Sequence, residues 1–218
     1  MAFEFFDPRK QVTVSHGHLP HWDQEGATYF ITWRTADSVP KAVWERWREA
    51  RALWLRSHGI DPLLKDWRKS LEELPEEERI SFRQFSKQLE DEMDAGHGAC
   101  LLKSQNLAAI VANALHFFDG SRYQLGDFVV MPNHVHLLVG GMARAAMLKQ
   151  VESWKKWTAL KINEAIGAHG RFWQDEHFDH LVRHAPAFEK FRIYIKGNPV
   201  KAGLRKGEYV LWERPEMK

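Results

Sequence analysis

Residues 123–139 read YQLGDFVVMPNHVHLLV, and this stretch decides the fold. Two runs rich in apolar and β-branched residues, 123–131 and 134–139, flank the dipeptide Pro132-Asn133. β-Branched residues favour strands, and Pro and Asn favour tight turns. The stretch therefore predicts two antiparallel strands joined in a hairpin.

The segments around this hairpin predict further strands and helices. Residues 27–35 (ATYFITWRT) show the two-residue alternation of a strand, and residues 172–183 are also strand-like. Apolar stripes at helical spacing predict one helix over residues 104–118 and a longer one over residues 144–168. Strands and helices in this order predict an α+β fold, in which an antiparallel sheet has helices packed on one face.

A last helix and an earlier helical segment complete the expected elements. Pro186 suits the first turn of the last helix, which we expect Gly197 and Pro199 to stop. Residues 40–98 are charged and helical in pattern and lie between strand-like segments. We therefore expect one domain over residues 1–218 with a helical insertion at about 40–98.

Composition and charge restrict the classes of protein that fit. The 218 residues have a formal net charge of only +2, yet residues 101–218 contain 17 Lys and Arg against 11 Asp and Glu. This local excess can attract polyanions, although it can also simply solvate helix surfaces. The single cysteine, Cys100, excludes cysteine-rich zinc modules. No apolar run is long enough to span a membrane and the N-terminus lacks a signal-peptide pattern, so we expect a cytoplasmic protein with no membrane partner.

Two histidines in the second strand of the hairpin form the sharpest chemical feature. His134 and His136 are two residues apart, so in a strand both side chains point to the same face. Two adjacent imidazoles make half of a metal site, although they also fit a pair of half-exposed histidines on a sheet surface. An apolar setting favours the metal site, because two polar rings without a shared ligand would be costly there.

The last helix contains a second candidate pair, Tyr194 and Asn198. These residues are one helical turn apart and share a face. A phenol can act as a nucleophile, and an amide oxygen can serve as a third metal ligand. A tyrosine at the edge of the core is the alternative interpretation.

The combined motifs resemble a known family. MPNHVHLLV (131–139) and YIKGNPVKAGL (194–204), with WKKWTALKIN and RFWQDEHFDHLVR between them, resemble the REP-associated tyrosine transposases, which belong to the insertion-sequence-200-like single-tyrosine HUH transposases. The resemblance covers roughly residues 20–35 and 99–212. It implies a ferredoxin-like or RRM-like fold, with metal ligands His134 and His136 and nucleophile Tyr194. Asn198 would be the third ligand, where many relatives have glutamine.

The resemblance also implies an activity. Such an enzyme cleaves and rejoins single-stranded, hairpin-forming DNA, such as REP-like palindromes, through a 5′-phosphotyrosine intermediate with Mg²⁺ or Mn²⁺, as a monomer or a homodimer. One alternative is a domesticated protein that binds or nicks hairpin DNA without transposition. Another is a metal-dependent hydrolase that uses the two histidines and a nearby carboxylate. Asp179 or Glu176 is a candidate for a supporting residue or a replacement ligand at the metal site.

Basic and aromatic residues near the motifs are candidate DNA contacts. Trp154, Trp157 and Trp173 fit either base stacking or the protein core. Lysines and arginines that flank the motifs in sequence are expected to contact phosphates, and they are Lys155, Lys156, Arg192, Lys196 and Lys201.

Overall fold

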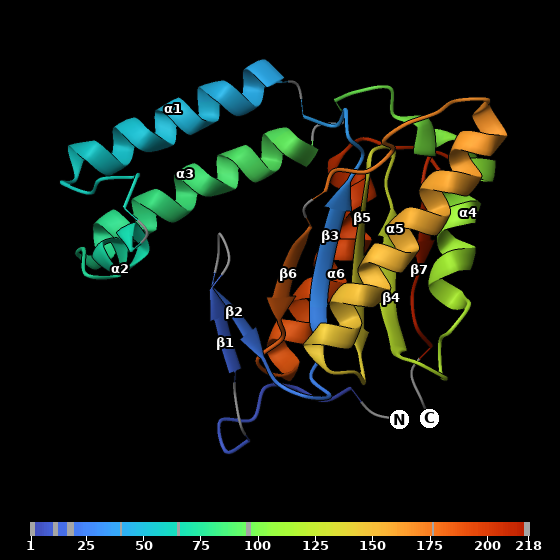
Figure 1. Ribbon diagram of the computed structural model, residues 1–218, viewed down its shortest axis with the longest axis horizontal. Helices are drawn as coiled ribbons and strands as arrows, with labels where there is room; N and C mark the ends of the chain where they lie inside the picture. Colours follow the sequence, from blue (N-terminus) through green and yellow to red (C-terminus); the bar gives the residue numbers. More distant parts are fainter. Residues whose placement is uncertain are drawn as a thin grey trace. The chain divides into compact units, whose positions relative to one another are not determined.

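The computed structural model describes residues 3–10, 13–16, 20–39, 41–64, 66–94, 97–175 and 177–215. The chain divides into two compact units (Figure 1). One unit comprises Met1–Ala36 and Ala99–Lys218, and the other comprises Asp37–Gly98. Within the described ranges, no helix is both long enough and apolar enough to cross a membrane.

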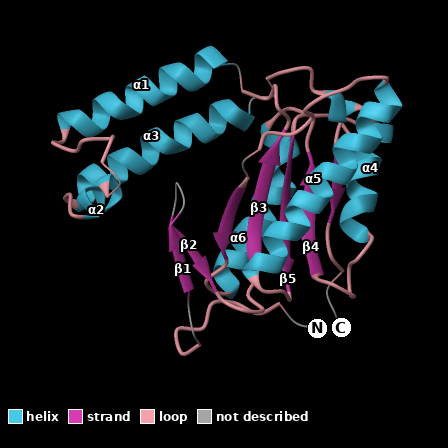
Figure 2. Cartoon of the chain, in the orientation of Figure 1, coloured by secondary structure: helices cyan, strands magenta, loops and turns pink. Residues whose placement is uncertain are grey.

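A five-stranded antiparallel sheet forms the centre of the larger unit (Figure 2). Its strand order is β6-β3-β5-β4-β7, so β5 is the central strand. The predicted α+β class and the hairpin are confirmed. The strands are β3 (Tyr29–Arg34), β4 (Gln124–Val130), β5 (His134–Gly140), β6 (Phe178–Leu181) and β7 (Val210–Trp212).

The β4–β5 hairpin contains an irregularity as well as the expected turn. At the turn, the Met131 amide donates to the His134 carbonyl at 2.8 Å. The register shifts between Leu125 and Phe128, so Gly126 and Asp127 lie opposite a single residue, as in a β-bulge. A Cβ on Gly126 would lie 2.7 Å from the Leu138 side chain, so only glycine fits there. The bulge redirects the side chain of Asp127, which accepts a hydrogen bond from Arg192.

Helices cover both faces of the sheet, which corrects the prediction that they pack on one face. Helices α4 (Gln105–His116) and α5 (Arg144–Ile166) pack on the face of Ile31, Val135 and Leu137. Helix α6 (Ala185–Lys201) packs on the opposite face, and Figure 1 shows α5 in front of the sheet and α6 behind it. The reason is that β5 is buried along its whole length, and both of its faces need apolar cover.

Helix α6 is longer than the sequence predicted. It continues through Gly197 and Pro199 to Lys201, and the Ala202 amide then donates to the Asn198 carbonyl at 3.0 Å. Proline has a backbone φ that suits a helix, and in the last turn it removes only one hydrogen bond. Asn198 therefore remains helical and keeps its one-turn spacing from Tyr194.

The N-terminal hairpin and the edge strands were not fully predicted. Strands β1 (Thr13–His16) and β2 (Pro20–Asp23) form a separate two-stranded sheet, and β7 was also missed. Of the strand-like segment 172–183, only β6 joins the large sheet, and Trp173 makes an isolated bridge to Thr35. Strands this short leave little periodicity in a sequence.

The smaller unit contains the helices expected at about 40–98. They are α1 (Lys41–Ser57), α2 (Trp67–Glu72) and α3 (Glu76–Asp94). Its core is small: Leu55 and Ile60 are buried, and the ring of Phe82 lies 4.9 Å from that of Trp54.

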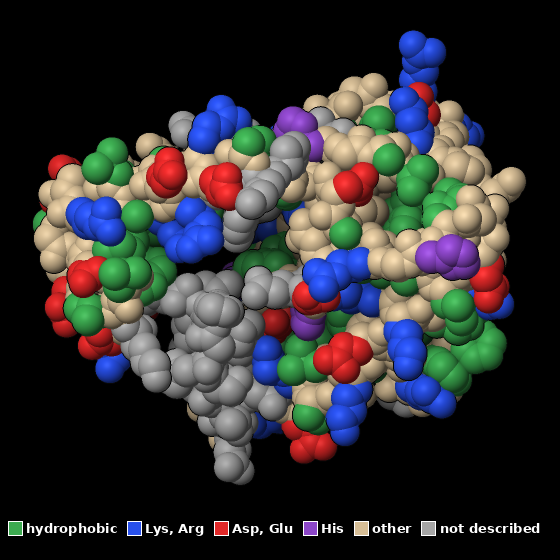
Figure 3. All heavy atoms as spheres, turned by 45° about the horizontal axis from the view of Figure 1, so that its top comes forward, with side chains coloured by type: hydrophobic (Ala, Val, Ile, Leu, Met, Phe, Trp, Pro, Cys, Tyr) green, Lys and Arg blue, Asp and Glu red, His purple; other side chains and the backbone are tan. Residues whose placement is uncertain are grey.

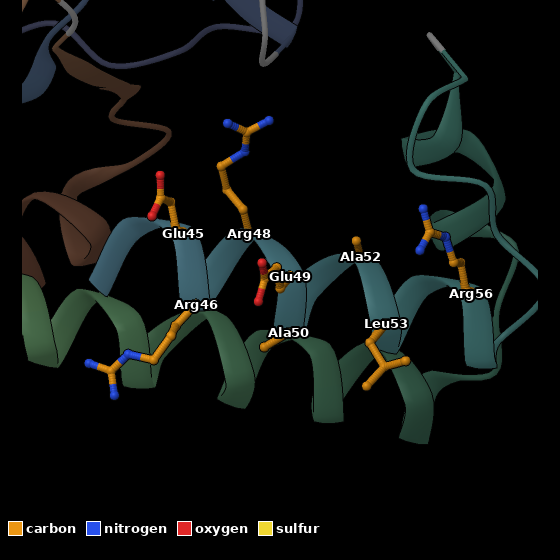
Figure 4. Close-up of a pocket in the computed structure, with 8 residues that line it drawn as sticks. All are labelled: Glu45, Arg46, Arg48, Glu49, Ala50, Ala52, Leu53 and Arg56. Carbon is orange, nitrogen blue, oxygen red and sulfur yellow. The ribbon is translucent and has the colours of Figure 1, made fainter. Parts of the chain in front are cut away.

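A shallow hollow lies along α1 in this smaller unit (Figure 4). Figure 4 shows Arg46 and Arg48 pointing to opposite sides of the helix. Glutamates accompany the arginines, so the lining has mixed charge, as a solvated helix surface does. The lining residues are Glu45, Arg46, Arg48, Glu49, Ala50, Ala52, Leu53 and Arg56.

Candidate active site

The two motif histidines lie side by side on the face of β5 that α6 covers. His134 is fully buried and His136 is 2% exposed, and their ring centroids are 4.6 Å apart. Val135 and Leu137 point into the opposite core. The shared face predicted from the two-residue period is confirmed, and the histidines are buried, which rules out the half-exposed surface pair.

Each imidazole is oriented through its Nδ1 atom. Nδ1 of His134 lies 2.7 Å from Oδ1 of Asn133, and Nδ1 of His136 lies 2.6 Å from the Thr32 hydroxyl on the neighbouring strand β3. Nε2 is therefore the nitrogen that each ring can offer to a metal ion. Thr32 was not predicted, although it is the residue directly opposite His136 in the sheet. Asn133 was expected only to shape the turn.

Asn198 completes the buried polar group from the side of α6. It is 3% exposed, and its side chain lies close enough to His134 to influence the pKa of that imidazole. Burial holds the pKa of His134 well below its ordinary value, the charges of His136 and Arg34 lower it further, and the nearby Asn198 side chain opposes them. His134 is therefore neutral near pH 7, which is the form that binds metals.

Tyr194 lies between this buried group and solvent. Its ring centroid is 5.1 Å from that of His136 and 5.9 Å from that of Phe30, and the residue is 36% exposed. Phe30 stacks on Phe191 at 4.4 Å and lies 5.5 Å from His136. These rings fix the position of the phenol, while its exposure leaves it open to a substrate from solvent.

An ion pair at the β-bulge holds α6 against the sheet. Nε of Arg192 donates to Oδ2 of Asp127 at 2.8 Å, and the Arg214 amide donates to the other carboxylate oxygen at 2.8 Å. The Asp127 side chain is only 3% exposed. Because Arg192 lies two residues before Tyr194, this contact sets the position of the tyrosine turn.

Asp127→Ala is expected to destabilise the protein markedly. Removing the buried carboxylate leaves Arg192 with only the exposed Glu189 at 3.4 Å and leaves the Arg214 amide without its acceptor, which costs about 3 kcal/mol. Urea unfolding measures the change. Glu164→Ala is the matched control, because Glu164 pairs with Lys161 at 2.8 Å on an exposed surface, where such a pair contributes less than about 1 kcal/mol. Equal shifts in the two variants would contradict the anchoring role of Asp127.

The predicted DNA contacts lie on two different faces of the sheet. Arg192 pairs with Asp127, and Lys196 pairs with Glu213 at 2.8 Å. Lys201 is exposed at the end of α6. Lys155 and Lys156 belong to α5, across the sheet from Tyr194. The face shown in Figure 3 has its Lys and Arg side chains dispersed among acidic and apolar ones.

The aromatic and acidic candidates mostly have structural roles. Trp154 and Trp173 are buried in the α5 core, which rules out base stacking for both, whereas Trp157 is 46% exposed. Asp179 faces the same core and pairs with Arg144 at 3.3 Å. It is therefore not a replacement ligand beside the histidines. Glu176 lies outside the described residues.

The donor set at the site fits a divalent metal ion. Two imidazole nitrogens and one amide oxygen make a mixed set that suits ions such as Mn²⁺. Nδ2 of Asn198 is buried and makes no hydrogen bond within the described ranges. No group of three or more His, Cys, Asp or Glu side chains in those ranges makes an alternative site.

Comparisons with known proteins give a family match and a similar solved structure. Residues 103–198 match the family model described as "Transposase IS200 like". A solved structure described as a REP-associated tyrosine transposase bound to a REP hairpin aligns with 88% of this chain and 77% of its own, at 14% identity and a TM-score of 0.44. No match was found among curated proteins. The matched segment, residues 103–198, contains both histidines, Tyr194 and Asn198.

Proposed function

We propose that the protein is a DNA strand transferase of the REP-associated branch, which cleaves and rejoins single-stranded, hairpin-forming DNA. The observation that carries the proposal is the position of Tyr194, whose ring lies 5.1 Å from that of His136 at the edge of a buried histidine pair. The matched transposase family supports the reaction class. The resemblance of the sequence to REP-associated enzymes supports hairpin DNA as the substrate.

His134, His136 and Asn198 would hold the divalent metal ion, Mg²⁺ or Mn²⁺. When bound, the ion would polarise the scissile phosphate and offset its negative charge. Asn133 and Thr32 orient the two rings, and burial keeps His134 neutral. The chain thus supplies preorganised ligands that need not rearrange on binding.

Tyr194 supplies the nucleophile for the covalent step. Its phenolic oxygen bonds to the phosphorus as the bond from phosphorus to the 3′ oxygen breaks. The phenol loses its proton, the 3′ oxygen gains one, and the products are a 5′-phosphotyrosine and a free 3′-hydroxyl. Reversal with another 3′-hydroxyl rejoins DNA without a nucleotide cofactor, because the phosphodiester is exchanged.

The rest of the chain is assigned to DNA binding and scaffolding. Residues 1–36 and 99–218 form the single catalytic domain, with residues 37–98 as an insertion. The protein acts in the cytoplasm as a monomer or a homodimer. Contacts to phosphates are assigned to Lys155, Lys156 and Lys201, because Arg192 and Lys196 pair with Asp127 and Glu213.

Covalent trapping tests the proposal. Wild-type protein with Mn²⁺ and a single-stranded hairpin substrate is expected to form an adduct that survives SDS. A 3′-end label should stay with the protein, and a 5′-end label should leave on the fragment with the free 3′-hydroxyl. EDTA should prevent the adduct. Cleavage that leaves a free 5′-phosphate and no adduct would instead identify a metal-dependent hydrolase.

A further inference from the structure

One edge of α6 combines the tyrosine with two lysines and a glycine. Lys190, Tyr194, Gly197 and Lys201 follow one another at helical spacing and share a side of the helix. All four are exposed, whereas the neighbouring Asn198 is buried against the sheet. Lys190 precedes Tyr194 by one turn, and Lys201 follows it by two, so the lysines bracket the proposed nucleophile.

The fold gives no reason for Gly197. Its φ is not positive, and a Cβ built there would meet no atom within 4 Å from the described residues outside its own helix backbone. Glycine inside a helix costs about 0.5–1 kcal/mol relative to alanine. The missing side chain does not improve packing, but it leaves the helix surface beside Tyr194 open. Glycine is typical of positions where a ligand lies close to the protein backbone.

On the opposite edge of α6 the two basic side chains pair with carboxylates. Arg192 faces Asp127 there, and Lys196 faces Glu213. These carboxylates partly neutralise the basic groups and would repel a phosphate. None of the four residues on the first edge is acidic.

We propose that the DNA strand on both sides of the cleaved phosphate runs along the Lys190–Lys201 edge of α6. Lys190 and Lys201 contact its phosphates, and Gly197 lets the sugar-phosphate backbone lie close to the helix. This inference rests on the proposed function and assigns the path of its substrate. The two lysines are about 16 Å apart along the axis, which spans roughly five nucleotides at a B-form rise and fewer in an extended strand.

Binding measurements on a non-cleaving background test this path. With Tyr194→Phe protein in EDTA, we expect Gly197→Leu to weaken binding to a hairpin with a single-stranded flank about tenfold, which is about 1.4 kcal/mol. Gly197→Ala should weaken it less. Both variants should unfold at higher urea concentration than the parent, because alanine and leucine are better helix formers. Lower affinity with higher stability is a combination that simple misfolding does not produce.

The lysines give an independent readout. Lys190→Gln is expected to reduce the slope of log affinity against log salt by about 0.7, the value for one lost contact with a single strand. Lys69→Gln is the control, since Lys69 is exposed on α2 and is not among the residues assigned to phosphates, and it should leave the slope unchanged. A blunt hairpin should show no effect of either Gly197 substitution.

The outcomes separate the path from the proposed function. If wild-type protein forms the covalent adduct while Gly197→Leu and Lys190→Gln bind the flanked hairpin as the parent does, the path is overturned and the function stands. If wild-type protein forms no adduct on any hairpin, the proposed strand-transferase function itself is contradicted. If the variants lose as much affinity for the blunt hairpin as for the flanked hairpin, these residues contact the stem, and the proposed path is also overturned.

Discussion

Tyr194→Phe protein is expected to form no covalent adduct with hairpin DNA in the presence of Mn²⁺. The substitution removes only the hydroxyl, and the ring that lies beside Phe30 and His136 is retained. Because the phenolic oxygen is the proposed nucleophile, no phosphotyrosine can form. Hairpin affinity should change little, since phosphate contacts carry most of it. Denaturing gels with 3′-labelled DNA measure the adduct, and fluorescence anisotropy measures affinity.

Tyr123→Phe is the matched control for this variant. The Tyr123 hydroxyl donates to the Leu115 carbonyl at 2.7 Å on the other side of the sheet, so its loss should cost roughly 1 kcal/mol of stability. Adduct formation should persist at the wild-type level. An adduct that survives Tyr194→Phe undiminished would show that another residue is the nucleophile.

His136→Ala is expected to abolish cleavage while most hairpin affinity remains. The variant removes one of the two proposed imidazole ligands of the metal ion. Without the ion, the transition state loses several kcal/mol of stabilisation of its negative charge, which slows the reaction about a thousandfold or more. Single-turnover cleavage at saturating protein measures this rate. Circular dichroism should show a folded protein, because the larger apolar core lies on the other face of the sheet.

Two further variants make the histidine prediction sharper. Thr32→Val removes the hydroxyl beside Nδ1 of His136 and should reduce metal affinity about 10- to 100-fold, with recovery at high Mn²⁺ concentration. His116→Ala removes a ring that packs on Phe128 and Trp212, and it should leave cleavage intact once folding is confirmed. Wild-type cleavage by His136→Ala would remove this histidine from the proposed ligand set.

Much of the fold could be predicted because the relevant patterns are local. The Pro132-Asn133 turn and the two-residue alternation around it predict the hairpin, and apolar stripes predict α4 and α5. The face of the sheet that α6 covers could not be predicted from such local patterns. Phe30 and Leu138 belong to the core beneath α6, but an apolar strand residue does not show which helix covers it. That choice depends on packing across the whole chain.

The same distinction applies to the site. His134, His136, Tyr194 and Asn198 fall in two short motifs, so residue spacing alone predicts that the members of each pair share a face. Thr32 lies 104 residues from His136, and only the strand register makes them partners. The role of Arg192 depends on a bulge that turns Asp127 toward α6. A count of charges could not distinguish a phosphate contact from this internal ion pair.

The covering of the sheet on both faces has a consequence for evolution and engineering. The larger apolar cluster, with α4 and α5, lies on the face away from Tyr194, and a smaller one underlies α6. Most of the hydrophobic stabilisation is therefore separate from the chemistry. New substrate preferences can be selected by altering exposed positions of α6 without exhausting the stability of the scaffold, which makes this helix the natural region for a randomised library.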